Sequence, residues 1–137
     1  MKMNKAIIII DDDITIIESV KFQVKETFGN DFEYETAQSG EEGLELIKEL
    51  ADEGYDVVVT ISDWLMPGMN GDEFLIQLHK IMPDTLKIML TGHATESAIN
   101  RAFKQANLYK VIGKPWAESE LIDAIKDGLK GKSPGTN

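Results

Sequence analysis

The chain alternates between apolar runs of strand length and longer segments in which apolar residues recur every three or four positions. Short apolar runs bounded by turn residues indicate strands, and the three-to-four spacing indicates amphipathic helices. A strand followed by a helix occurs five times, with strands predicted at 6–10, 32–37, 56–61, 86–90 and 108–112. This alternation is typical of an α/β fold in which helices cover both faces of a doubly wound parallel sheet.

The composition of the strands predicts their places in the sheet. The run 6–10 contains four consecutive isoleucines, and the run 56–61 is also apolar, so both are expected to be central strands buried on both faces. In the run 32–37, Phe32, Tyr34 and Thr36 alternate with other residues that include two glutamates. That alternation indicates an edge strand with one face in water.

The five helices are predicted from their end signals and their apolar faces. Gly29 ends the first helix, and Ser39 with Glu42 forms a capping box that begins the second. The fourth helix is expected from about Thr95 and the fifth from Ser119. The residues expected to face the core are Ile17, Val20, Val24, Phe28, Leu44, Ile47, Ala51, Phe74, Leu78, Ile81, Ile99, Ala102, Phe103, Ala106, Ile122, Ile125 and Leu129.

The length of 137 residues fits one domain. A chain of about 150 residues can bury roughly two-thirds of its unfolded surface in a single core. We expect this domain to occupy residues 1–130. The segment 131–137 lacks periodicity and is expected to be a disordered tail.

The charge and the missing cysteines limit the function classes. The formal net charge is −10, which argues against a direct nucleic-acid partner or an anionic membrane surface because both would repel the chain. The absence of cysteine excludes disulfides, thiol catalysis and cysteine metal sites. The apolar runs are too short to span a bilayer and the chain begins without a signal-peptide pattern, so we expect a cytoplasmic protein.

The residues that follow the predicted strands are the candidates for chemistry, because ligands of open parallel sheets bind at the carboxyl ends of the strands. The residues at these positions are Asp11, Asp12 and Asp13 after the first strand, Ser62 and Asp63 after the third, Thr91 after the fourth, and Lys114 and Pro115 after the fifth.

Several carboxylates at one edge repel one another, so a positive charge is expected among them. A cluster of oxygen ligands suits Mg²⁺, and Lys114 can supply a second positive group. Together they predict phosphoryl transfer, with Asp63 as the nucleophile and with Thr91 and Lys114 holding the phosphoryl oxygens.

Each candidate also has an ordinary structural explanation. The three successive aspartates could have no role beyond capping the following helix and interacting with its dipole. If they are functional, the pair could be Asp12 and Asp13 instead of Asp11 and Asp12. Asp63 could be a turn residue before Pro-Gly. We interpret His93 as a loop residue beside the site, with control of access as the alternative. The joint occurrence at four strand ends favours a functional site.

Four stretches of sequence resemble the motifs of response-regulator receiver domains. They are Ile7-Ile8-Ile9-Ile10-Asp11-Asp12, the segment from Ser62-Asp63-Trp64 to Asn70-Gly71, Leu90-Thr91-Gly92, and Lys114-Pro115-Trp116. The stretches follow the family's order and spacing, and the resemblance covers residues 4–130. It implies a flavodoxin-like sheet of five parallel strands in the order 2-1-3-4-5, flanked by five helices.

The resemblance implies that Asp63 accepts a phosphoryl group from a histidine kinase or a histidine phosphotransfer protein. Thr91 and Lys114 would contact the phosphoryl group, and the Lys114–Pro115 peptide is expected to be cis. The domain would be a switch that catalyses at most its own phosphorylation and dephosphorylation.

The resemblance also implies a set of Mg²⁺ ligands. Asp12 and Asp63 would bind the ion directly, the backbone carbonyl of Leu65 would be the third protein ligand, and Asp11 would act mostly through water.

Two positions depart from the family's usual pattern. Val111 stands three residues before Lys114, where the family usually has a Tyr or Phe that rotates as a switch, and Tyr109 lies in a different register. A backbone shift of the fourth helix and fifth strand would then carry more of the signal. Leu65 has no polar side chain to guide a hydrolytic water toward Asp63, so we expect a long-lived phosphoryl-aspartate.

The resemblance implies an output domain or downstream protein as the second partner, bound to a face formed by 98–106, 107–111 and 120–126. Dimerisation through the fourth and fifth helices is compatible with it. An Asp-nucleophile phosphohydrolase is disfavoured because Leu65 stands where such an enzyme has a second acid. A flavodoxin-like cofactor binder is disfavoured by the acidic first loop, and a non-phosphorylated interaction module stays an alternative.

Overall fold

The computed structural model describes residues 4–131 and contains a sheet of five parallel strands in the order β2-β1-β3-β4-β5. The strands are β1 (Lys5–Ile10), β2 (Glu33–Ala37), β3 (Asp56–Ser62), β4 (Leu86–Thr91) and β5 (Lys110–Gly113). The predicted fold class and strand order are therefore confirmed. Residues 132–137 of the tail that the sequence predicts to be disordered lie outside the described residues.

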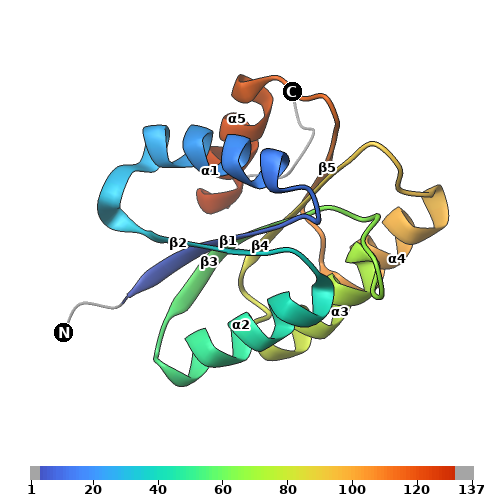
Figure 1. Ribbon diagram of the computed structural model, residues 1–137, viewed down its shortest axis with the longest axis horizontal. Helices are drawn as coiled ribbons and strands as arrows, with labels where there is room; N and C mark the ends of the chain where they lie inside the picture. Colours follow the sequence, from blue (N-terminus) through green and yellow to red (C-terminus); the bar gives the residue numbers. More distant parts are fainter. Residues whose placement is uncertain (1–3, 132–137) are drawn as a thin grey trace.

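The helices cover both faces of the sheet (Figure 1). The helices α1 (Ile14–Phe28) and α5 (Glu118–Leu129) lie on one face, and α2 (Gly40–Asp52), α3 (Gly71–Ile81) and α4 (Glu96–Ala106) lie on the other. A short 3-10 turn, η1 (Gly29–Asp31), follows α1. Among the described residues, no helix has the length and apolar character needed to cross a membrane.

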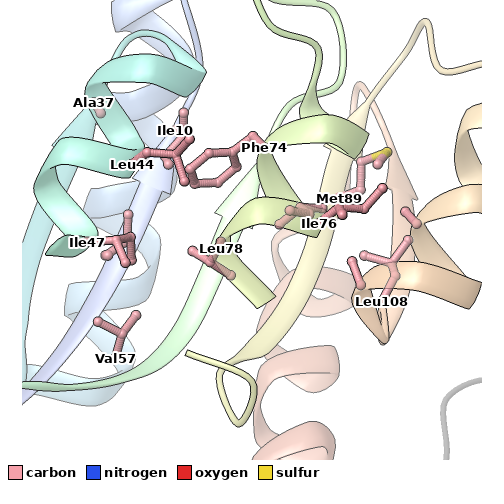
Figure 2. Packing of buried hydrophobic residues seen from close by; sticks show 14 of the residues in the cluster. Ile10, Ala37, Leu44, Ile47, Val57, Phe74, Ile76, Leu78, Met89 and Leu108 are labelled. Atoms are coloured by element: carbon pink, nitrogen blue, oxygen red, sulfur yellow. The ribbon is translucent and has the colours of Figure 1, made fainter. Parts of the chain in front are cut away.

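The central strands are buried on both sides, as their composition predicts. In β1, Ile8 and Ile10 belong to the cluster beneath α2, α3 and α4, whereas Ile7 and Ile9 belong to the cluster beneath α1 and α5. Figure 2 shows the first cluster, in which the fully buried ring of Phe74 lies beside Ile10. Replacing such a ring by alanine costs about 3–5 kcal/mol of stability. Because Ile10 is the last residue of β1, its packing with Phe74 stabilises the carboxyl end of the sheet.

Four residues predicted to face the core are exposed instead: Ala51, Ile81, Phe103 and Leu129. In α4 the inward positions are held by alanines such as Ala102 and Ala106, which are fully buried. Phe103 follows Ala102 by one residue, which is about 100° around the helix at 3.6 residues per turn, and it therefore points away from the sheet. A spacing of three or four residues alone cannot separate such neighbouring positions.

The last strand begins two residues later than predicted. Asn107 ends α4 in a left-handed conformation with φ 55°, and the backbone N–H of Leu108 still bonds to the carbonyl of Ala102. The apolar residues Leu108 and Tyr109 therefore belong to the connection before β5 (Lys110–Gly113).

A lysine is buried near the amino end of the sheet. Lys87 of β4 is fully buried, and its Nζ donates hydrogen bonds to the carbonyls of Pro83 and Thr85, each at 3.1 Å. Burial lowers the pKa of Lys87 to about 8, although the charge of Asp84 opposes this shift. Beside it, the hydroxyls of Thr60 and Thr85 form a buried hydrogen bond of 3.0 Å.

Candidate functional site

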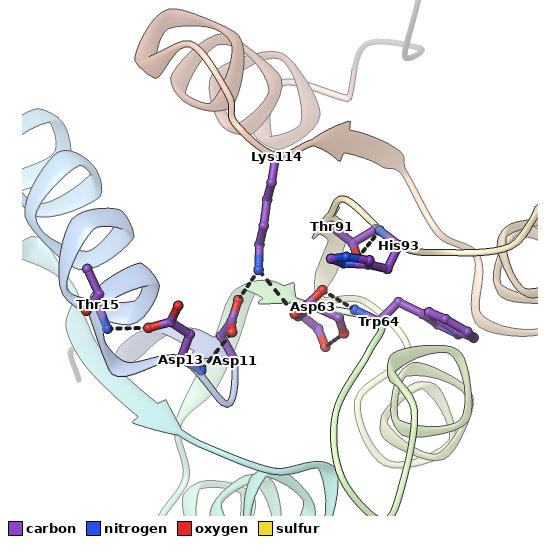
Figure 3. A network of polar contacts seen from close by, with 9 residues as sticks. Asp11, Asp13, Thr15, Asp63, Trp64, Thr91, His93 and Lys114 are labelled. Atoms are coloured by element: carbon purple, nitrogen blue, oxygen red, sulfur yellow. Dashed lines mark hydrogen bonds and ion pairs between the residues drawn. The ribbon is translucent and has the colours of Figure 1, made fainter.

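The candidate residues meet at the carboxyl ends of β1, β3, β4 and β5 (Figure 3). The backbone N–H of Asp63 donates to the carbonyl of Ile10 at 2.9 Å, which fixes the end of β3 against β1. The N–H of Lys114 donates to the carbonyl of Thr91 at 3.2 Å and fixes β5 against β4. The parallel sheet thus brings together residues that are about fifty or a hundred positions apart in the sequence.

Lys114 joins the two buried aspartates of the site. Its Nζ lies 2.7 Å from Oδ2 of Asp11 and 3.1 Å from Oδ2 of Asp63. Asp11 is 2% exposed and Asp63 is 6% exposed, so the three groups form a largely desolvated cluster. Two carboxylates around one ammonium leave a net negative charge that attracts a further cation.

The pKa shifts in this cluster follow from burial and pairing. Burial raises the pKa of Asp11, although the hydrogen bonds from Lys114 and from the backbone N–H of Asp13 oppose it. For Lys114, burial alone would lower the pKa, but its hydrogen bonds and charge interactions with Asp11 and Asp63 outweigh burial and raise the pKa. Lys114 therefore stays positively charged at neutral pH.

The structure also brings Asp12 to this cluster. Asp11, Asp12 and Asp63 each offer a carboxylate oxygen, and these oxygens all lie within 4.8 Å of one another. Asp12 is exposed, which leaves one side of the group open to water. An open group of carboxylate oxygens fits a hard divalent cation of the Mg²⁺ type, which retains several waters when bound.

Asp13 has a different role. It is the N-cap of α1, and its Oδ1 accepts a hydrogen bond of 2.9 Å from the backbone N–H of Thr15. The interpretation of the aspartates as a helix cap is therefore correct for Asp13 alone. Of the two pairs that the sequence allows, Asp11 and Asp12 lie with Asp63, whereas Asp13 is outside that group.

Thr91 lies on the other side of Asp63 from Asp11, because β3 separates β4 from β1 (Figure 3). Thr91 is 4% exposed, and its hydroxyl oxygen accepts a hydrogen bond of 3.3 Å from the backbone N–H of His93. His93 itself is exposed in the loop beside the site, as its position in the sequence predicts.

The loop after Asp63 is held close to it. The backbone N–H of Trp64 donates to Oδ1 of Asp63 at 2.7 Å, and the N–H of Gly71 donates to the carbonyl of Trp64 at 2.7 Å. A side chain at Gly71 would collide with the backbone of Asp63 and Trp64, so this position needs glycine. Leu65 is 48% exposed on the outside of the loop.

The residues in and after β5 include one feature that the sequence predicts and one that departs from the family's usual pattern. The Lys114–Pro115 peptide is cis, as expected. Val111 is partly buried against the α2–α4 side of the sheet and pairs in register with Met89, whereas Tyr109 packs on the opposite side. Tyr109 therefore does not replace the aromatic residue missing at Val111.

Sequence reasoning missed a polar network beyond Trp64. The indole N–H of Trp64 donates to Oδ1 of Asp72 at 2.8 Å, and Arg101 of α4 bonds to both Asp72 and Glu73. The position of Asp72 in the first turn of α3 is a weak signal because acids are common there. The contact with Arg101 spans 29 positions and has no local signal.

Comparison with known proteins gives consistent matches. The family described as "Response regulator receiver domain" matches residues 7–126. Chemotaxis protein CheY-3 of Vibrio cholerae is 30% identical over 127 residues, which are 91% of this chain and 92% of that protein. The structure of a CheY-like response regulator receiver domain protein from Methanospirillum hungatei has a TM-score of 0.81 at 30% identity, covering 95% of this chain and 96% of that one.

A longer relative matches only in part. The hydrogenase transcriptional regulatory protein HoxA of Cupriavidus necator is 26% identical over 132 residues, which are 96% of this chain and 26% of that protein. The chain therefore spans about a quarter of the length of this regulator.

Proposed function

The chain belongs to the response-regulator receiver domain family, and from this we propose that Asp63 is its phosphoacceptor. Receiver domains are signalling switches and not conventional enzymes. The phosphoryl donor we propose is a phosphohistidine on a histidine kinase or a histidine phosphotransfer protein. The observation that carries the proposal is the pair of short contacts from Lys114 to Asp11 and Asp63.

The proposed step is a direct transfer. A carboxylate oxygen of Asp63 forms a bond to phosphorus while the phosphorus–nitrogen bond of phosphohistidine breaks, and the electron pair of that bond stays on the imidazole nitrogen. The product is an acyl phosphate. Lys114 stabilises the phosphoryl oxygens with its positive charge, and the Thr91 hydroxyl donates to one of them.

We further propose a Mg²⁺ site made of Asp11, Asp12 and Asp63, with the backbone carbonyl of Leu65 as an additional ligand. The three carboxylates fit the ion because their oxygens approach within 4.8 Å and one of them, Asp12, is open to water. When bound, the ion neutralises charge between the carboxylates and the incoming phosphoryl group. Asp12 and Asp63 would bind it directly and Asp11 mostly through water.

The proposed output is a change at the face formed by 98–106, 107–111 and 120–126, read by an output domain or a downstream protein. Residues 1–130 would act as one cytoplasmic signalling unit, and a homodimer through α4 and α5 is one form that its output could take. The net charge of −10 supports a protein partner over nucleic acid or a membrane.

Mass spectrometry tests the phosphoacceptor. The chain is incubated with a small phosphodonor and Mg²⁺, and we expect a single phosphate adduct that is stable in acid and labile in base. The adduct should be lost in Asp63→Asn and kept in Asp13→Asn, whose cap role an asparagine can fill. Many turnovers of free phosphate from an added phosphoester would instead favour a phosphohydrolase. An adduct that survives in Asp63→Asn would refute the assignment.

A further inference from the structure

A continuous chain of hydrogen bonds runs from Asp63 to α4. The backbone N–H of Trp64 donates to Oδ1 of Asp63 at 2.7 Å, and the indole N–H of the same residue donates to Oδ1 of Asp72 at 2.8 Å. The guanidinium of Arg101 donates to Oδ2 of Asp72 at 3.0 Å. Trp64 thus bonds the phosphoacceptor through its backbone and α3 through its side chain, which points away from Asp63 (Figure 3).

Asp72 is the central group of this chain. Its side chain is 11% exposed, and each of its two oxygens accepts one hydrogen bond. Oδ1 accepts from the indole of Trp64, and Oδ2 accepts a charge-assisted bond from Arg101. Arg101 also bonds to Oε1 of Glu73 at 2.8 Å, so its planar guanidinium spans two acids of the first turn of α3. A movement of the indole that breaks its bond to Asp72 therefore removes one of the two hydrogen bonds that orient this carboxylate toward Arg101.

The loop and α4 have room to move relative to one another. A hollow of about 540 Å³ lies between them, lined by Trp64, Met69, Ala98 and Arg101 among others. The side chain of Arg101 is 41% exposed, so its bond to Asp72 is not locked by surrounding packing. The polar link from the loop to α4 thus runs through Asp72 of α3, and it has space on one side.

Phosphorylation of Asp63 would change the hydrogen bond between Asp63 and the backbone N–H of Trp64. Oδ1 of Asp63 belongs to a carboxylate, and a hydrogen bond from Trp64 to an ionised acceptor is stronger than one to a neutral acceptor. Conversion of the carboxylate to an acyl phosphate removes that ionised acceptor and weakens the hold on Trp64. Val111 in β5 has no aromatic ring that could carry the signal by rotating.

We propose that Trp64, Asp72 and Arg101 form a relay that couples the state of Asp63 to the position of α4. Asp72 and Arg101 are positioning residues in this relay, since they act on Asp63 only through Trp64. The inference rests on the proposed role of Asp63 as the phosphoacceptor, and it assigns the route by which that role reaches the output face.

The test compares backbone amide NMR shifts with and without beryllofluoride and Mg²⁺, because beryllofluoride binds a carboxylate as a phosphoryl mimic. In the wild type we expect the amides of α4 to shift. In Trp64→Phe, which keeps the backbone N–H and a ring but removes the indole N–H, the α4 shifts should fall by about half or more, and likewise in Arg101→Met. The double variant should lose no more than either single variant, because the two residues act in series.

Lys104→Met is the matched control, since it removes an exposed cation from the same helix. It should leave the α4 shifts at the wild-type level. Unchanged α4 shifts in Trp64→Phe and Arg101→Met, with beryllofluoride still bound at Asp63, would overturn the relay and leave the phosphoacceptor intact. Additive losses in the double variant would also overturn it. If beryllofluoride does not bind the wild type at Asp63, the proposed function fails and the relay fails with it.

Discussion

A lysine lies near each end of the sheet, Lys114 partly buried and Lys87 fully buried, and the pKa values of the two shift in opposite directions. Lys114 at the carboxyl end contacts two carboxylates, whereas Lys87 near the amino end contacts two backbone carbonyls. The pKa of Lys114 is raised and that of Lys87 is lowered to about 8.

The difference comes from the charge of the acceptors. Burial lowers the pKa of both lysines, since it disfavours the charged form. Carboxylates outweigh that effect at Lys114, while the carbonyl dipoles at Lys87 carry no charge. Burial alone therefore does not indicate that a lysine is functional. The contacts of Lys114 with two carboxylates are what distinguish it from Lys87.

Replacing each lysine by methionine should give the largest difference between the two ends of the sheet, measured as the rate of adduct formation at Asp63. In Lys114→Met the phosphoryl oxygens lose their ammonium, and we expect adduct formation at Asp63 to slow by about 100-fold or more. In Lys87→Met the rate should stay near that of the wild type, because Lys87 lies near the far end of the sheet. The rates are measured by mass spectrometry at fixed phosphodonor and Mg²⁺. An equal slowing in both variants would show that the two ends are not independent.

The lowered pKa of Lys87 should appear in the pH dependence of the free energy of unfolding. Below pH of about 8 the folded and unfolded chains both carry its proton, so this group gives no slope. Between about 8 and its ordinary pKa of 10.5, only the unfolded chain retains the proton, so the free energy of unfolding rises with pH. The rise is limited to about 3 kcal/mol by the size of the shift.

Urea unfolding at several pH values measures this rise as the difference between the wild type and Lys87→Met. The difference should increase in favour of the wild type from pH 8 upward. Lys104→Met serves as the control, and its curve should run parallel to that of the wild type. A pH-independent difference for Lys87→Met would mean that Lys87 titrates normally in the folded chain.

The aspartates at the carboxyl end of the sheet, which we call the rim, should differ in how much each contributes to Mg²⁺ affinity. Asp12→Asn removes one charge from the three-carboxylate group, and we expect Mg²⁺ affinity to fall by about 10–100-fold. Asp13→Asn should leave the affinity near the wild-type value, because that residue caps α1. Titration calorimetry measures both. A weaker site in Asp13→Asn than in Asp12→Asn would reverse the assignment of the pair.

The smallest effect is expected at Leu65. Its exposed side chain offers no polar group to an attacking water, and Leu65→Asn supplies one. The phosphoryl-aspartate should then decay several-fold faster, as followed by the loss of the adduct over time. Leu65→Met changes the shape but adds no hydrogen-bond donor, so its decay should match the wild type. An unchanged lifetime in Leu65→Asn would remove Leu65 as the reason for slow hydrolysis.

Much of the fold could be predicted because burial on both faces leaves a direct mark on the sequence. The isoleucines of 6–10 and the apolar run 56–61 form the central strands, and the side chains at their ends reach one rim. The start of β5 was predicted two residues early because Leu108 is apolar for another reason, since it packs under α4.

The rest depends on contacts between distant residues. Lys87 has the charge of a surface residue, and only the carbonyls of Pro83 and Thr85 explain its burial. The bond between Asp72 and Arg101 depends on how α3 and α4 pack, which no local pattern records. The sequence placed the acids and the ammonium at the rim, whereas the network around them required the packed structure.

The strand order has a consequence for synthesis of the protein. The carboxylates of the rim follow β1 and β3, while the ammonium of Lys114 follows β5, the last strand and an edge of the sheet. Ribosomes make a chain from its amino end, so a nascent copy that has reached β4 holds the acids without their cation. We expect such unfinished copies to be inert toward a phosphodonor, and they would not compete with finished ones for the signal.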